Sequence, residues 1–248
     1  MCIRDSNSVI EPLRDQFPGS NTNYYSVQHW AQVSNADTGV TLSPVESHLL
    51  EFGGLWPCYV SQAHHGVTPP GFGRPFVGAE QMTKGHVYAF VIDGNFRTNF
   101  QPVQQSDILF RYSLTSHAGP QPLSECRDFG WAAHNRLIGH LLYGRKEGPL
   151  PRRSSFCSLD KPNVWLVTIK RAEDGVGLIV RLIETEGKDT TATLAMPHLA
   201  IEKAWHTNIV EENLTELPCT QHQVTVPIKA YGIATLRLQT PSVPVSSP

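Results

Sequence analysis

The chain lacks several features that would assign a protein to a class at once. None of its apolar runs approaches the roughly 20 residues that a membrane-spanning helix needs, and the net charge of its 248 residues is only −2. So small a charge gives no electrostatic reason for binding nucleic acid or an anionic membrane. No secretory signal can be read at the start of the chain. We therefore expect neither nucleic acid nor a membrane as a partner.

Cysteine is scarce and poorly placed for cross-linking. There are five cysteines, an odd number, and they are widely scattered with no C-x-x-C pair. This pattern argues against a disulfide framework and against a structural zinc site. With the absence of a signal sequence, it favours a cytoplasmic protein, but the localisation stays open. The five are Cys2, Cys58, Cys126, Cys157 and Cys219.

Turn-forming residues, in contrast, are abundant. The chain has 19 glycines and 19 prolines, with 40% hydrophobic and 17% charged residues. This composition is that of a globular protein. Many short apolar runs lie between the glycines and prolines, which indicates an all-β fold.

The second half of the chain predicts a small antiparallel sandwich. Its most informative stretch, from Lys161 to Glu184, is interpreted as two strands joined by the turn Asp174-Gly175. Further alternating or β-branched runs follow at short spacing, which is typical of sandwiches. The predicted strands are 163–171, 177–185, 191–196, 204–210, 224–229 and 232–239.

The first half predicts more strands, a long irregular loop at 55–85 and one helix. The helix is predicted within 126–143, where Trp131, Leu137, Ile138, Leu141 and Leu142 fall near helical spacing. A long irregular loop inside a compact domain is usually functional. The strands are predicted at 24–34, 40–42, 48–52, 86–92 and 107–116.

These elements suggest two β-rich domains. Residues 144–154 combine glycine, proline, serine and charge, and are predicted to be a linker. We expect part of a large β-sandwich at 7–143, a smaller sandwich at 155–240 and a frayed tail at 241–248. Residues 1–6 resemble a translated adapter sequence and lead into no element that the pattern predicts, so we exclude them from the fold.

Catalytic signatures are weak. Glycoside hydrolysis needs two carboxylates, but Glu51, Glu80, Asp93 and Asp107 form no recognisable arrangement. The adjacent pair at 64–65, both histidine, would point to opposite sides of an extended chain and make a poor chelate. There is no G-x-S-x-G nucleophile motif. We expect no catalytic residue and no metal site in this chain.

One polar cluster has the chemistry of a sugar contact. Side-chain amides, a guanidinium group and neighbouring aromatics suit sugar hydroxyls, which donate and accept in fixed directions. The same side chains could instead satisfy local backbone groups in a turn, and both alternatives stay open. The candidate substrate-binding residues are Asn95, Arg97, Thr98, Asn99 and Gln101.

Several segments, in order, carry a resemblance to a known family. Asn95-Phe-Arg-Thr-Asn-Phe100 with Gln104 is followed by Phe110-Arg-Tyr-Ser-Leu114, and later come Lys170-Arg-Ala-Glu-Asp-Gly175 and Asn208 with Glu211-Glu-Asn213. The chain resembles, from about residue 20 onward, the C-terminal β-domains of glycoside hydrolase family 38, the α-mannosidases. Phe96 departs from the tryptophan expected there.

The resemblance implies the end of a large, galactose-mutarotase-like super-sandwich followed by a small immunoglobulin-like sandwich. It also implies a retaining α-mannosidase that acts on mannose-containing oligosaccharides, with an aspartate nucleophile and a zinc ion. In the family those residues belong to an N-terminal catalytic domain, so none is assigned to this chain. We expect the chain to be the C-terminal portion of such an enzyme, inactive alone and a partner of its own N-terminal catalytic domain.

Two alternatives stay open. The chain could be a stand-alone carbohydrate-binding or adhesion sandwich without catalysis. It could also support a hydrolase of different specificity, because specificity depends on residues of the site and not on the fold.

Overall fold

The computed structural model describes most of the chain and divides it into two units. Unit 1 is Met1–Leu137 and unit 2 is Ile138–Pro248. The described part contains four antiparallel sheets and a single helix, so the prediction of an all-β fold is confirmed. The described residues are 1–5, 8–18, 20–54, 77–79, 82–92, 103–141, 143–144 and 151–241.

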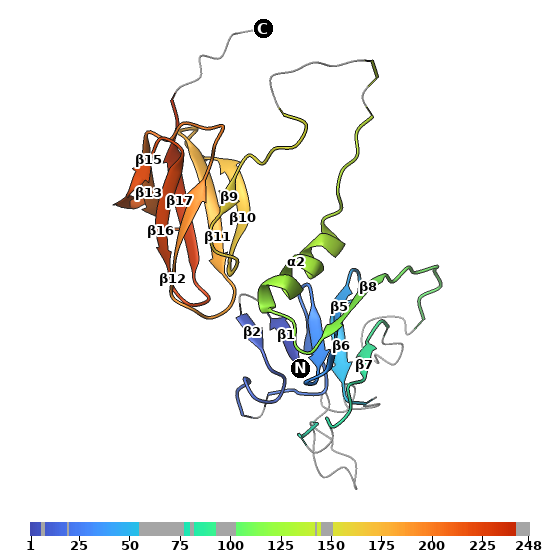
Figure 1. Ribbon diagram of the computed structural model, residues 1–248. Coiled ribbons are helices and arrows are strands. Elements are labelled where there is room, and N and C mark those ends of the chain that lie inside the picture. Colours follow the sequence, from blue (N-terminus) through green and yellow to red (C-terminus); the bar gives the residue numbers. More distant parts are fainter. Residues whose placement is uncertain are drawn as a thin grey trace. The chain divides into compact units, whose positions relative to one another are not determined.

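Unit 1 contains two sheets (Figure 1). The first has the strand order β2-β1-β4-β5-β8 and the second has the order β3-β6-β7. Tyr25, Leu50 and Phe52 of the second sheet pack with Ile3 and Ala31 of the first in one buried cluster. The strands are β1 (Cys2–Asp5), β2 (Ser8–Ile10), β3 (Tyr25–Ser26), β4 (Ala31–Ser34), β5 (Thr38–Pro44), β6 (Leu49–Phe52), β7 (Val87–Ala89) and β8 (Tyr112–Ala118).

Helix α2 (Leu123–His134) lies against β5 of this unit. Gly130 allows the close approach, since a Cβ atom there would lie 2.5 Å from the carbonyl oxygen of His29. The buried Cys126 accepts a hydrogen bond from the Gln32 amide at 2.9 Å. The helix ends where the backbone N–H of Asn135 bonds the Trp131 carbonyl.

The structure corrects three expectations for this unit. Residues 1–6 were excluded from the fold, but Cys2–Asp5 form β1, which pairs with both β2 and β4. The predicted helix 126–143 starts earlier and ends at His134, and Leu137, Ile138 and Leu141 beyond it are exposed. These apolar residues have helical spacing, but they are exposed, so no packing stabilises a helix there. The strand predicted at 107–116 begins only at Tyr112.

Unit 2 is a sandwich of two antiparallel sheets (Figure 1, yellow to red). The five-stranded sheet has the order β10-β11-β17-β13-β14 and the four-stranded sheet has the order β15-β16-β12-β9. The strands are β9 (Ser158–Leu159), β10 (Val164–Arg171), β11 (Leu178–Glu184), β12 (Thr190–Ala195), β13 (Lys203–Thr207), β14 (Asn213–Leu217), β15 (Cys219–Thr220), β16 (Gln223–Ile228) and β17 (Ile233–Gln239).

The core of unit 2 lies between these sheets. Alternate residues of β17, namely Ala234, Leu236 and Leu238, face it together with residues of β11 and β12. Thr235, Arg237 and Gln239 therefore lie on the outer face of the five-stranded sheet, because successive side chains of a strand point to opposite sides. This alternation places a polar surface over an apolar core.

The six strands predicted for this half are all present, and the Asp174-Gly175 turn joins β10 to β11 as predicted. The short strands β9 and β15 and the five-residue β14 were not predicted. β14 contains Asn213, Leu214 and Thr215, all exposed, so it carries no alternating pattern that would mark a strand.

The unit boundary found from contacts falls after Leu137. The predicted linker 144–154 and the predicted tail 241–248 remain predictions, since most of both lies outside the described residues. No helix in the described part of the chain is long and apolar enough to cross a membrane.

Candidate functional site

The residues predicted to contact sugar lie outside the described residues. They are Asn95, Arg97, Thr98, Asn99 and Gln101. Most of the proline- and glycine-rich loop 55–85 also lies outside them. The prediction for this segment therefore stays a prediction, and the described candidate site is in unit 2.

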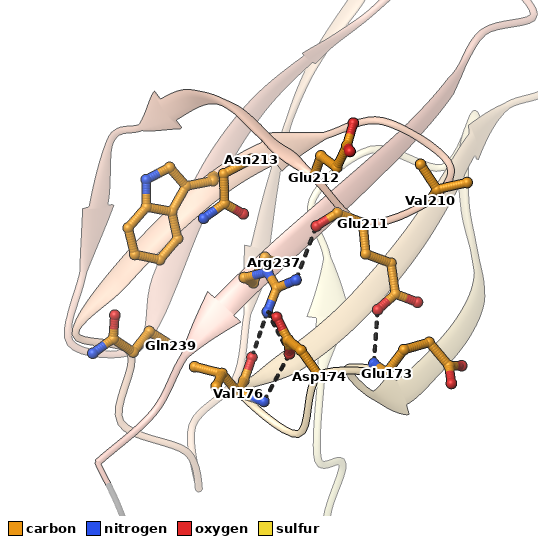
Figure 2. A pocket seen from close by; sticks show the side chains of 10 residues that line it. Glu173, Asp174, Val176, Val210, Glu211, Glu212, Asn213, Arg237 and Gln239 are labelled. Atoms are coloured by element: carbon orange, nitrogen blue, oxygen red, sulfur yellow. Dashed lines mark hydrogen bonds and ion pairs between the residues drawn. The ribbon is translucent and has the colours of Figure 1, made fainter.

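A cleft of about 450 Å³ opens on the outer face of the five-stranded sheet of unit 2 (Figure 2). This volume lies within the range of small-molecule sites. Two loops border the cleft: the turn 172–177 between β10 and β11, and the loop 208–212 between β13 and β14. Its lining residues are Glu173, Asp174, Val176, Trp205, Val210, Glu211, Glu212, Asn213, Arg237 and Gln239.

Strand register brings the floor of the cleft together. Trp205 of β13 pairs with Arg237 of β17, which in turn pairs with Ile179 of β11. The three side chains therefore form one row across the outer face, although they are far apart in the sequence. Because Ala204 is in the core, Trp205 points outward.

Arg237 joins both bordering loops. It is only 7% exposed, and its Nη1 donates to the Asp174 carboxylate at 2.7 Å and to the Val176 carbonyl at 2.9 Å. Its Nη2 donates to the carbonyl of Glu211 at 2.8 Å. The charged hydrogen bond from Arg237 holds the pKa of Asp174 below its usual value. One guanidinium group thus fixes the positions of two loops (Figure 2).

Glu211 forms a second link between the loops. Its carboxylate bonds Lys170 Nζ at 2.7 Å and accepts the backbone N–H of Glu173 at 2.9 Å. The Lys170 ammonium, followed by this backbone donor, lowers the pKa of Glu211. Glu211 also has a φ of +71°, a conformation that is strained for a residue with a side chain. The surrounding bonds hold it there.

The loop 208–212 is organised from within by Asn208. Its Oδ1 accepts the backbone N–H groups of Val210 and Glu212, at 3.1 and 2.9 Å. Its Nδ2 donates to the Glu212 carboxylate at 2.7 Å. Asparagine side chains commonly replace backbone partners in such turns. The loop therefore has a defined shape without a ligand.

Other groups in the cleft are free to bind. Within the described part of the chain, the side-chain amide of the exposed Asn213 and the indole N–H of Trp205 have no hydrogen-bond partner in the structure. Gln239 makes only a long contact of 3.4 Å to Glu202. In Figure 2, Asn213 and Gln239 lie on one side of Arg237 and Glu173 on the other.

The two carboxylates that link the loops, Asp174 and Glu211, are poorly suited to act as general acids. A glycosidase needs a carboxylic acid whose pKa is raised, so that it can donate a proton near neutral pH. Asp174 and Glu211 both have lowered pKa values. Across the described ranges, no group of three or more His, Cys, Asp or Glu side chains is placed to hold a metal ion.

The sequence singled out the two bordering segments but not the cleft. Residues 170–175 and 208–213 carried the family resemblance, and the structure brings them together at Arg237. Trp205, Arg237 and Gln239 were not predicted. Their signal was the polar or aromatic residue at alternate positions of apolar strands, which marks an outer face but does not show which strands are neighbours.

Comparison with protein families gives one match. Residues 163–236 match the family described as "Glycosyl hydrolases family 38 C-terminal beta sandwich domain". The match includes β10 to β16 and most of β17, and it ends just before Arg237, so it covers both bordering loops and Trp205 but not Arg237 or Gln239 of the cleft. Comparison with curated proteins gives no match.

Solved structures of longer proteins share the fold. An α-mannosidase from Enterococcus faecalis V583 superposes with a TM-score of 0.56 and 17% identity, over 96% of this chain and 24% of that one. A glycosyl hydrolase family 38 protein from Enterococcus faecalis gives 0.55 and 16%, with the same coverage. The chain thus spans about a quarter of the length of the structures that it matches. The sandwich of unit 2, over residues 163–236, is therefore similar to the C-terminal β sandwich domain of glycosyl hydrolase family 38.

Proposed function

We propose that this chain is the C-terminal part of an α-mannosidase-like glycoside hydrolase that removes α-linked mannose from oligosaccharides. The observation that carries the proposal is the family 38 match of residues 163–236. The fold supports it, because 96% of the chain follows part of an α-mannosidase from Enterococcus faecalis. The reaction then takes place in a catalytic domain N-terminal to this chain, by a retaining mechanism, and any zinc is bound there.

In this proposal the two units support the catalytic domain. The strand-rich, hydrogen-bonded core of unit 2 suits a scaffold. The segment with Asn95, Arg97, Thr98, Asn99 and Gln101 would lie at the rim of the catalytic pocket and contact sugar hydroxyls. Amides and a guanidinium group are the side chains that such contacts use.

The proposal is tested with the complete reading frame of the source DNA. We expect that frame to encode a domain N-terminal to this chain, and the complete protein to hydrolyse 4-nitrophenyl α-D-mannoside. The 248-residue chain alone is expected to be inactive. A complete frame without such a domain, or a complete protein active only on other glycosides, would contradict the proposal.

The role of the rim is tested separately. Arg97→Ala and Asn99→Ala in the complete enzyme should raise KM for an oligosaccharide substrate by about tenfold, the loss of one good hydrogen bond to a charged group. Unchanged kinetics with unchanged thermal stability would remove these residues from the site and leave the enzyme assignment intact.

A further inference from the structure

The cleft in unit 2 has no role in the proposed reaction, yet its composition is that of a binding site. We propose that it binds a neutral pyranose oligosaccharide, with one sugar ring on the face of Trp205. The proposal goes beyond the proposed function and does not depend on catalysis. It starts from the position of Trp205, which is a large aromatic residue on the outer face of a sheet and lines an open cleft.

The shape and the surface of the cleft suit a sugar ring. The cleft is bordered by loops that are fixed before any ligand arrives, through Arg237 on one side and Asn208 within the second loop. A preformed cleft costs a ligand less ordering entropy than a flexible one. Val176 and Val210 on the two loops are 56% and 69% exposed. They offer the C–H faces of a sugar ring further apolar surface in the same cleft.

The cleft also offers hydrogen-bond donors and acceptors next to each other. Sugar hydroxyls both donate and accept, so they need donors and acceptors side by side. The Asn213 amide provides both, and the Trp205 N–H donates. The Glu173 side chain is 82% exposed, and its carboxylate can accept beside its ion pair with Lys170. Arg237 adds a buried donor, since its Nε has no partner among the described residues. A buried unpaired donor is uncommon in a folded protein, and this one belongs to a residue that lines the cleft.

The charged side chains of the cleft favour a neutral ligand. Four carboxylates line the cleft, and only one cationic side chain, Arg237, does so. An anionic ligand such as a phosphate would therefore be repelled. Asp174 is paired with Arg237, and Glu173 and Glu211 share Lys170. The Glu212 carboxylate accepts a hydrogen bond from Asn208. Each carboxylate therefore already has a partner, which reduces its attraction for a simple cation. A neutral ligand with many hydroxyls fits this balance best.

The experiment uses the 248-residue chain and calorimetric titration with α-mannobiose, maltose, cellobiose and tetramethylammonium. We expect saturable binding of at least one disaccharide, with a dissociation constant on the order of 1 mM. Comparing the affinity for α-mannobiose with that for maltose and cellobiose shows whether the cleft prefers mannose or glucose. Trp205→Ala should weaken binding at least tenfold and Asn213→Ala about threefold to tenfold. Asn213 is exposed and has no partner within the described part of the chain, so its substitution leaves the fold intact.

The matched control is Trp165→Phe. Trp165 lies on β10 and pairs with Ile183, at the other end of the same sheet, and does not line the cleft. It should leave sugar affinity unchanged. The absence of binding by any disaccharide would overturn the inference, as would equal binding by the Asn213→Ala variant or binding of tetramethylammonium alone. None of these results would alter the hydrolysis assay that tests the proposed function.

Discussion

Two buried charges of unit 2, Glu184 at the end of β11 and Arg237 of β17 beside the start of β11, have different surroundings. Glu184 is fully buried, and its two carboxylate oxygens accept five hydrogen bonds. At the start of β11, Arg237 lies beside Ile179 in a cleft where the side chains of Trp205 and Asn213 have no hydrogen-bond partner among the described residues. The donors to Glu184 are the Asn163 amide and the backbone N–H groups of Glu186, Gly187, Lys188 and Tyr231.

This difference in hydrogen bonding marks the Glu184 end as a structural cluster and the Arg237 end as a candidate binding site. The Glu184 carboxylate is so fully satisfied that a ligand would have to break existing bonds. Burial alone would raise the pKa of Glu184, but the hydrogen bonds, led by those from Tyr231 and Glu186, outweigh it and the pKa is lowered. At the cleft end, the bonds fix the loops and leave Trp205 and Asn213 free. Unsatisfied groups in an open cleft therefore point to function, and satisfied buried ones to stability.

The largest expected effect is at the satisfied end. Glu184→Ala leaves five donors without an acceptor, and we expect the free energy of unfolding to fall by about 4 kcal/mol. Urea unfolding of the chain measures it. Glu216→Gln, an exposed position on β14, is the control and should change stability by less than about 0.5 kcal/mol. Equal effects of the two would show that the Glu184 cluster is not a structural centre.

A smaller loss is expected from the turn that borders the cleft. Gly177 has a φ of +79°, and a Cβ atom there would lie 2.3 Å from the carbonyl oxygen of Leu238. Gly177→Ala should therefore destabilise the chain by about 3 kcal/mol, from backbone strain and the clash. Gly175 has nearly the same φ, +78°, but its nearest neighbour would be 3.6 Å away. Gly175→Ala should cost only about 1 kcal/mol, and the difference in melting temperature between the two checks the packing of this turn.

The substitution Arg237→Ala tests whether one side chain holds both loops. We expect a loss of about 2 kcal/mol in the free energy of unfolding and faster hydrogen exchange at the amides of Glu173 and Val176, which depend on the fixed loops. Arg171→Ala is the control, since Arg171 is exposed and makes only a 3.5 Å contact with Gly175. Unchanged exchange in Arg237→Ala would mean that the loops hold their shape without the guanidinium group.

The smallest effect concerns pH. The pKa of Glu184 is lower in the folded protein than its usual value of 4.5. Its stabilisation is therefore fully present above about pH 4.5 and is lost as the pH falls through the folded value. Stability of the native chain should decline more steeply below about pH 4.5 than that of Glu184→Gln, when both are followed by urea midpoints. Parallel curves would contradict the lowered pKa.

The sequence predicted unit 2 better than unit 1, for a physical reason. The β10–β11 hairpin is recognisable because its alternation and its Asp174-Gly175 turn are local features. The end of α2 was not, because Leu137 and Ile138 continue a helical spacing although the backbone leaves the helical conformation at Asn135 (φ −110°, ψ 84°). A pattern of apolar residues shows which face could be buried, but only the tertiary structure shows whether anything covers it.

The cleft could not be predicted from the sequence for a related reason. Trp205 and Arg237 become neighbours only through the register of β13 with β17, and register is a long-range property. Residues 170–175 and 208–213 were noticed separately, with no indication that they meet. The candidate sugar-contact segment at 95–101 lies outside the described residues, so the sequence remains its only support.

Hydrogen exchange with and without α-mannobiose is the most direct test of the difference between the two ends. The account predicts slower exchange in residues 172–177 and 208–213 when the sugar is present, and no change in residues 184–190 and 229–232. Protection at the Glu184 end, or none at the cleft under conditions where the sugar binds, would contradict it.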